Sequence, residues 1–139
     1  MASATSDLGS TGGLSAAAQK KKIIDAFQDY VARWQGLNAH TTIRFATIPW
    51  PVLNDKLVTS PEQLTSTLIA AFLLSPHHSG DKSRKDRIKA ELLRWHPDRF
   101  EGRYLAKVVE SDKENVKAAV GEVARCLSDL LSMEGSFGA

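Results

Sequence analysis

The sequence predicts an all-α fold, and three observations support that prediction. Apolar side chains recur at helical spacing in residues 15–34, 81–95 and 111–131. Residues 64–74 are mostly apolar and follow a strong helix-start sequence. Proline-containing stretches separate these segments. The 139 residues suffice for one domain, and 42% apolar and 24% charged residues are typical of a soluble globular protein.

We divide the chain into five parts. Residues 1–14 are rich in Ser, Thr, Ala and Gly and have almost nothing to bury, which predicts a disordered tail. The other parts are an N-terminal helix packed on the core (15–36), a proline-containing connector (37–59), a helical core (60–132) and a frayed tail (133–139).

The N-terminal helix is amphipathic and is expected to begin near Ser15 and stop near Gly36. Its apolar face consists of Ile23, Phe27, Tyr30 and Trp34. The connector then places Trp50 between two prolines, which favours extended backbone. We expect Ile48, Trp50, Val52 and Leu53 to cover the core rather than to bind a partner. Residues 42–45 could form a short strand, but the sequence supplies no evident pairing partner.

The helical core begins at Ser60, where serine as N-cap, Pro61 and a capping Gln63 predict a helix start. That helix ends at Ser75-Pro76. Its apolar face is Leu64, Leu68, Ala71 and Phe72, widened by Ile69, Leu73 and Leu74, so we expect it to be largely buried.

The next helix, residues 81–95, buries Ile88, Leu92 and Trp95 and carries the remaining charges on its solvent side. Residues 82–94 hold six basic and two acidic side chains, a net charge of +4. A short, partly helical connection over residues 97–108 follows, and a final helix opens near residue 111. Its inner face is Val116, Val120, Val123, Leu127 and Leu130 or Leu131.

The string Arg94-Trp95-His96-Pro97-Asp98-Arg99-Phe100 interrupts the helical pattern between these two segments. The ring of Pro97 disfavours helical geometry at His96 and removes a backbone donor, so the preceding helix should end near Trp95. Polar and charged side chains are then presented at a bend, where they can contact a partner. The alternative is a helix-terminating turn in which Asp98 caps the next segment.

Composition and motifs exclude several classes of function. The histidines lack the close spacing of zinc ligands, and Cys126 falls within an apolar helix face, where cysteine is usually a packing residue. No glycine-rich loop follows a strand to hold a phosphate. We therefore expect no enzyme activity, no metal and no cofactor or small-molecule substrate. A single cysteine and the lack of any apolar run of roughly 20 residues favour an intracellular protein, cytoplasmic or nuclear, that does not enter the membrane.

The basic helix allows three interpretations. Most charged helix faces are solvated surface. A net charge of +4 over four turns could also bind nucleic-acid phosphates, although its polar face lacks interleaved aromatic residues. It could instead meet an acidic protein surface, where it would set orientation and association rate.

The order of elements between residues 61 and 131 resembles the J domain of DnaJ-type co-chaperones. Trp95 falls where that family has an aromatic residue, and Lys89, Arg94 and Arg99 fall where it is basic. The string 94–100 is most similar to the divergent J-like region of the NF-kappa-B inhibitor-like proteins and of uncharacterised fungal J-like proteins.

Two further features bear on this resemblance. Leu127-Ser128-Asp129 matches the Leu-Ser-Asp that commonly ends the third helix of J domains. Glu91, in contrast, falls where J domains usually carry a buried leucine. The Tyr-x-x-Leu-Gly signature of the first helix is also missing, and no client-binding module follows.

The resemblance implies an antiparallel helical hairpin with an added N-terminal helix. It also implies a co-chaperone that docks on a DnaK-type heat-shock chaperone and stimulates its ATP hydrolysis. The partner-binding residues would be His96, Pro97, Asp98, Arg87, Lys89, Arg94 and Arg99. The alternatives are a J-fold adaptor without co-chaperone activity and, third, a nucleic-acid-binding module.

Overall fold

The computed structural model describes residues 15–138, and the tail predicted over residues 1–14 lies outside them. The described residues form α2 (Ala16–Gly36), α3 (Ser66–Leu73), α4 (Arg84–Trp95), α5 (Pro97–Tyr104) and α6 (Lys113–Gly138), joined by short 3₁₀ turns. No β-strand occurs in this part of the chain, and the predicted all-α fold is confirmed.

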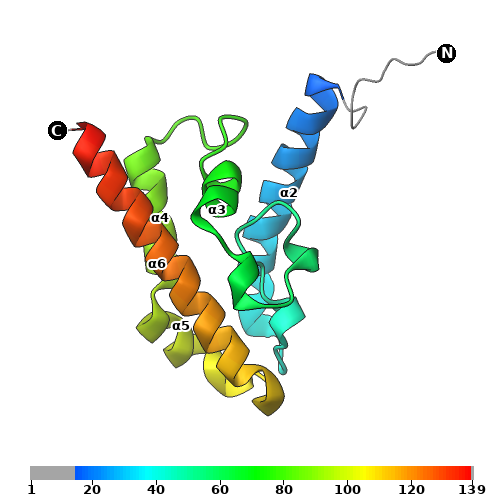
Figure 1. The fold of residues 1–139 in the computed structure, drawn as a ribbon. Coiled ribbons are helices and arrows are strands. Elements are labelled where there is room, and N and C mark those ends of the chain that lie inside the picture. The colour runs from blue at the N-terminus through cyan, green and yellow to red at the C-terminus, as the bar shows by residue number, and fades with distance from the viewer. Residues whose placement is uncertain (1–14, 139) are drawn as a thin grey trace.

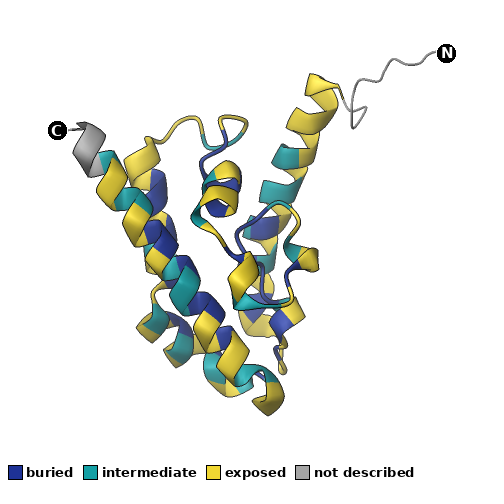
Figure 2. Cartoon of the chain, in the orientation of Figure 1, coloured by how far each residue is buried: buried dark blue, intermediate teal, exposed yellow. Residues whose placement is uncertain are grey.

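Helices α4 and α6 lie side by side and run in opposite directions (Figure 1). Arg84 at the start of α4 donates from Nε to Glu134 Oε2 near the end of α6, at 2.8 Å. Buried residues recur along the side of α6 that is turned to the interior (Figure 2): Val116, Ala119, Val120, Val123, Cys126 and Leu127. This pair is compatible with the expected antiparallel hairpin.

Helix α6 continues to Gly138, through residues 133–138, where the sequence predicted a frayed tail. The ion pair between Arg84 and Glu134 holds the last part of α6 against α4 and favours the continued helix. Residue 139 lies outside the described part of the chain.

Helix α2 begins next to Ser15, as expected, and the Ser15 hydroxyl caps it by accepting from the Ala18 N–H at 3.0 Å. It buries Tyr30 and Trp34 in its second half, whereas Ile23 and Phe27 are only half-buried. The N-terminal helix thus joins the core through its C-terminal half.

The connector fills the space beside α2 (Figure 1) and is part of the core. Trp50 is 1% exposed, and its indole Nε1 donates to the Phe45 carbonyl at 3.0 Å. This confirms that Trp50 covers the core and excludes it as an exposed anchor. Residues 42–45 form no strand, but Ile43 makes an isolated parallel bridge with Val108.

The predicted cap at Ser60 is confirmed, but the long helix expected to follow it is wrong. Gln63 Oε1 does accept from the Ser60 N–H at 2.9 Å, but Pro61–Gln63 form only one 3₁₀ turn. Leu64 leaves the helical region (φ −95°, ψ 97°), and its side chain is buried at 1% exposure. Burial of Leu64 therefore breaks the helix, and α3 restarts at Ser66 with Thr65 as its cap.

Helix α3 is also less buried than expected, because it is covered on one side only. Ile69, Phe72 and Leu73 are buried, whereas Leu68 is 50% exposed and Ala71 is exposed.

Two boundaries around the bend also differ from the expectation. Helix α4 begins at Arg84, three residues later than expected, because the Ser83 hydroxyl caps it by accepting from the Asp86 N–H at 3.1 Å. The expected partly helical connection contains a two-turn helix, α5, with Pro97 in its first turn.

Candidate partner-binding site

The bend between α4 and α5 is a tight corner made by one residue. His96 ends α4 and is at the same time the N-cap of α5, with φ −57° and ψ 124°. Its ring Nδ1 accepts from the Asp98 N–H at 3.2 Å, and its carbonyl accepts from the Phe100 N–H at 2.9 Å. The predicted alternative, with Asp98 as the cap, is therefore wrong because His96 occupies the capping position.

Two buried aromatic rings hold this corner in place. Trp95 is fully buried, and its ring lies nearly parallel to that of Phe100, with centroids 6.0 Å apart and an interplanar angle of 7°. Trp50 stacks on Trp95 at 5.5 Å, and Trp34 meets Trp95 edge-on at 4.9 Å. Because aromatic side chains bury a large apolar area, this cluster makes the bend a rigid part of the core.

The polar residues of the bend lie outside the aromatic cluster. His96, Asp98 and Arg99 are exposed, and Pro97 is half-buried. Within residues 15–138, the Asp98 carboxylate takes part in no hydrogen bond or ion pair of its own. Since successive helical residues turn by about 100°, Arg99 points to a different side of α5 from Asp98.

Arg87 does not lie on the solvent side as expected. It is only 9% exposed, and its guanidinium donates to the carbonyls of Leu73 at 2.6 Å and Ser75 at 2.9 Å. Leu73 is the last residue of α3 and Ser75 lies just beyond it, so Arg87 caps the end of that helix from the neighbouring one. The arginine is part of the core and does not present its charge to a partner.

Arg94 is also largely engaged within the chain. Its guanidinium carbon lies 5.4 Å from the centroid of the Tyr30 ring and 5.2 Å from that of Trp34, in cation–π geometry. One nitrogen also donates to Glu91 Oε2 at 3.2 Å. Of the three partner-binding residues predicted on this helix, Arg87, Lys89 and Arg94, Lys89 alone is exposed.

Glu91, 9% exposed, is the centre of a buried polar network. The Tyr30 hydroxyl donates to Glu91 Oε1 at 2.6 Å and accepts from the Trp95 indole at 3.0 Å. Burial raises the pKa of Glu91, while the nearby positive charge of Arg94 opposes that rise. Burial also raises the pKa of Tyr30 well above its ordinary value, and the Glu91 charge adds to that rise.

This network accounts for the burial of Glu91 on α4, because α2 supplies the hydroxyl that pairs with its carboxylate. Sequence reasoning missed the burial of Glu91. A signal was present, since Glu91 lies three positions after Ile88 and four before Trp95 and therefore on the apolar face of the helix.

No group of three or more His, Cys, Asp or Glu side chains among residues 15–138 could hold a metal ion. Cys126 is fully buried, with its Sγ 3.9 Å from the Leu64 carbonyl. None of the helices in the described part is both long and apolar enough to span a bilayer.

Searches of curated proteins and of solved structures find no match to this chain. A family model does match, over residues 66–134, which include α3, the bend and most of α6 and leave α2 and the connector outside. The predicted relation to the NF-kappa-B inhibitor-like proteins is thereby supported: residues 66–134 are similar to the C-terminal domain of NF-kappa-B inhibitor-like protein 1.

Proposed function

We propose that this protein is a J-domain-like co-chaperone that docks on a DnaK-type heat-shock chaperone and stimulates its ATP hydrolysis. The observation that carries the proposal is the bend. A rigid aromatic cluster fixes its backbone, while the side chains of His96 and Asp98 are exposed. An exposed carboxylate that has no partner among residues 15–138 can accept a charge-assisted bond from an arginine of the chaperone.

The structure changes which basic residues would assist docking. Arg87 and Arg94 are engaged internally, so they would act by shaping the helix rather than by touching the chaperone. Lys85 and Lys89 are exposed one helical turn apart on α4 and would supply the positive charge that steers association.

The test is a single-turnover ATPase measurement with a DnaK-type chaperone from the same source. We expect several-fold stimulation by the native protein, which His96→Gln and Asp98→Asn abolish. Glu101→Gln is the matched control, because it removes a carboxylate from the same helix three residues further on. Thermal unfolding should show Asp98→Asn within about 0.5 kcal/mol of the native protein. No stimulation, or stimulation that survives Asp98→Asn, would refute the proposal.

A second candidate is a J-fold adaptor without co-chaperone activity. The internal use of Arg87 and Arg94 favours it, because it reduces the positive charge available for a chaperone. The adaptor hypothesis predicts a purified partner whose binding is unchanged by Asp98→Asn and whose presence has no effect on the chaperone's ATPase rate.

A further inference from the structure

A groove of about 300 Å³ lies between the C-terminal end of α2, the second half of α4 and α5. We propose that this groove binds an acidic peptide segment of another protein. The proposal does not rest on the chaperone function, since the groove lies on the Arg99 side of α5 and neither His96 nor Asp98 lines it.

The groove is basic. Arg94, Arg99 and Arg103 all line it, and no acidic residue does so within the described chain. Arg99 and Arg103 are four residues apart on α5, so their side chains lie on the same face. Neither forms an ion pair with any residue between 15 and 138. Two neighbouring guanidinium groups without carboxylate partners therefore border the same groove.

Arg94 also borders the groove, although Glu91 balances part of its charge. The rings of Tyr30 and Trp34 position its guanidinium, and one nitrogen donates to Glu91, which leaves its other donors available. A guanidinium fixed in this way loses little side-chain entropy when it binds a carboxylate. The groove thus combines one arginine held by internal contacts with two exposed arginines that have no ion pair among the described residues.

The walls of the groove favour a peptide over a nucleic acid. Stacking of bases requires exposed aromatic faces, but Trp34, Phe100 and Tyr104 are at most 7% exposed. The apolar surface that is available is Leu93, which is 60% exposed on α4. A peptide that carries several carboxylates and an apolar side chain is complementary to a groove with arginines beside an exposed leucine.

The experiment measures fluorescence anisotropy of a labelled peptide with eight glutamates and aspartates around a central leucine, titrated with the full chain. We expect saturable binding that Arg103→Glu weakens about tenfold or more, with a larger loss for the double variant Arg99→Glu/Arg103→Glu. Replacing the acidic residues of the peptide by their amides should abolish binding. Leu93→Ala should weaken it by a smaller factor.

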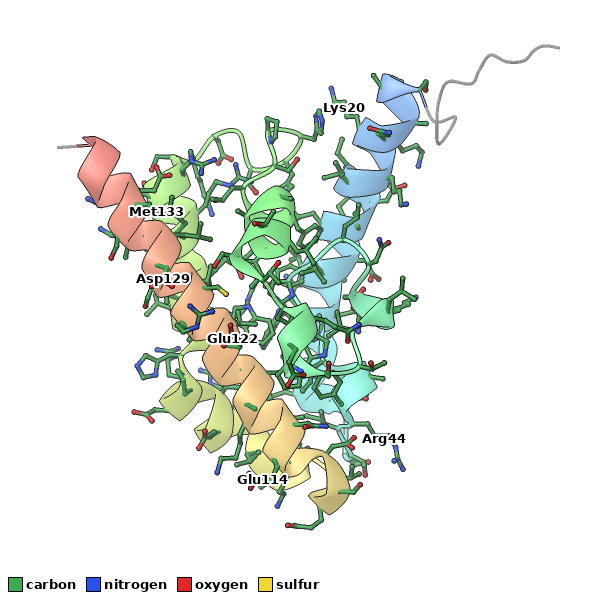
Figure 3. The ribbon with its side chains drawn as sticks, viewed as in Figure 1. Lys20, Arg44, Glu114, Glu122, Asp129 and Met133 are labelled. Carbon is green, nitrogen blue, oxygen red and sulfur yellow. The ribbon has the colours of Figure 1, made fainter. Side chains whose placement is uncertain are left out.

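The matched control is Lys20→Glu/Lys117→Glu, which changes the net charge by the same amount as the double groove variant. Lys20 lies at the start of α2, at the opposite end from the groove (Figure 3), and Lys117 is exposed on α6. Equal losses in both double variants would show non-specific charge attraction and overturn the proposal. Absence of saturable binding would overturn it as well.

Two comparisons separate this proposal from the others. The first comparison uses a decauridylate RNA. If the RNA binds in a manner that depends on Arg103 and the acidic peptide does not bind, the groove belongs to nucleic acid and the proposal is overturned. Peptide binding should be unchanged by Asp98→Asn, which instead tests the chaperone function. A loss of peptide binding in Asp98→Asn would place the peptide at the bend and refute the groove assignment.

Discussion

Replacing Tyr30 by phenylalanine removes a single hydroxyl group from the centre of the molecule. That hydroxyl donates to Glu91 at 2.6 Å and accepts from Trp95 at 3.0 Å, and all three residues are buried. A hydrogen bond to a charged group contributes about 1.5–3 kcal/mol, and a neutral one contributes about 0.5–1.5 kcal/mol. We therefore expect Tyr30→Phe to lower the free energy of unfolding by about 3 kcal/mol. For a chain of this size, that loss lowers the melting temperature by about 10 °C.

The assay is urea unfolding followed by tryptophan fluorescence, with Tyr104→Phe as control. Tyr104 is 6% exposed, similar to Tyr30 at 3%, but its hydroxyl has no hydrogen-bond partner among the described residues. The control should therefore change stability by less than about 0.5 kcal/mol. Because the Tyr30 bond favours ionised Glu91, the loss in Tyr30→Phe should be larger at pH 7 than below the pKa of Glu91. A loss below about 1 kcal/mol, or one equal to that of the control, would refute the hydrogen-bond network.

Three further predictions test the core. The pKa of Glu91 is raised in the folded protein, so its stabilising contribution is complete below the ordinary value of 4.5 and is lost as the pH rises through the folded pKa. Urea unfolding between pH 4 and 8 should show this decline in the native protein, and a decline that persists in Glu91→Gln would assign it to another group. Arg87→Met should destabilise the fold by about 2 kcal/mol, because it leaves two buried carbonyls without donors, whereas the exposed Lys89→Met should stay within about 0.5 kcal/mol. Equal losses in the two variants would contradict the capping role. Cys126 is fully buried, so a thiol reagent should label it at the rate of chain opening, and fast labelling of the native protein would contradict that burial.

Local patterns in the sequence were sufficient for the apolar face of α6 and for the corner between α4 and α5. The apolar face of the last helix follows the helical period, and Val116, Val120, Val123 and Leu127 are all buried. The proline after His96 ends α4 at Trp95, as expected from its restriction of the preceding residue. These features depend on neighbours within a few positions, which a sequence shows directly.

The start of α3 shows where local signals are insufficient. The capping sequence at Ser60 forms its expected bond, yet the helix does not continue. Burial of Leu64 against the rest of the core favours an extended residue at that point and outweighs the local preference. The sequence holds the cap, but the distant contacts decide whether a helix follows it.

The roles of the charged residues on α4 show the same division. The sequence determined that this protein is all-α, that a basic helix leads into a bend, and that His96 and Asp98 are free to be exposed. Only the tertiary structure decided that Arg87 caps α3, that Arg94 lies on aromatic rings, and that Glu91 is buried. The reason is that exposure depends on what covers a side chain, and the hydroxyl that pairs with Glu91 comes from 61 residues away.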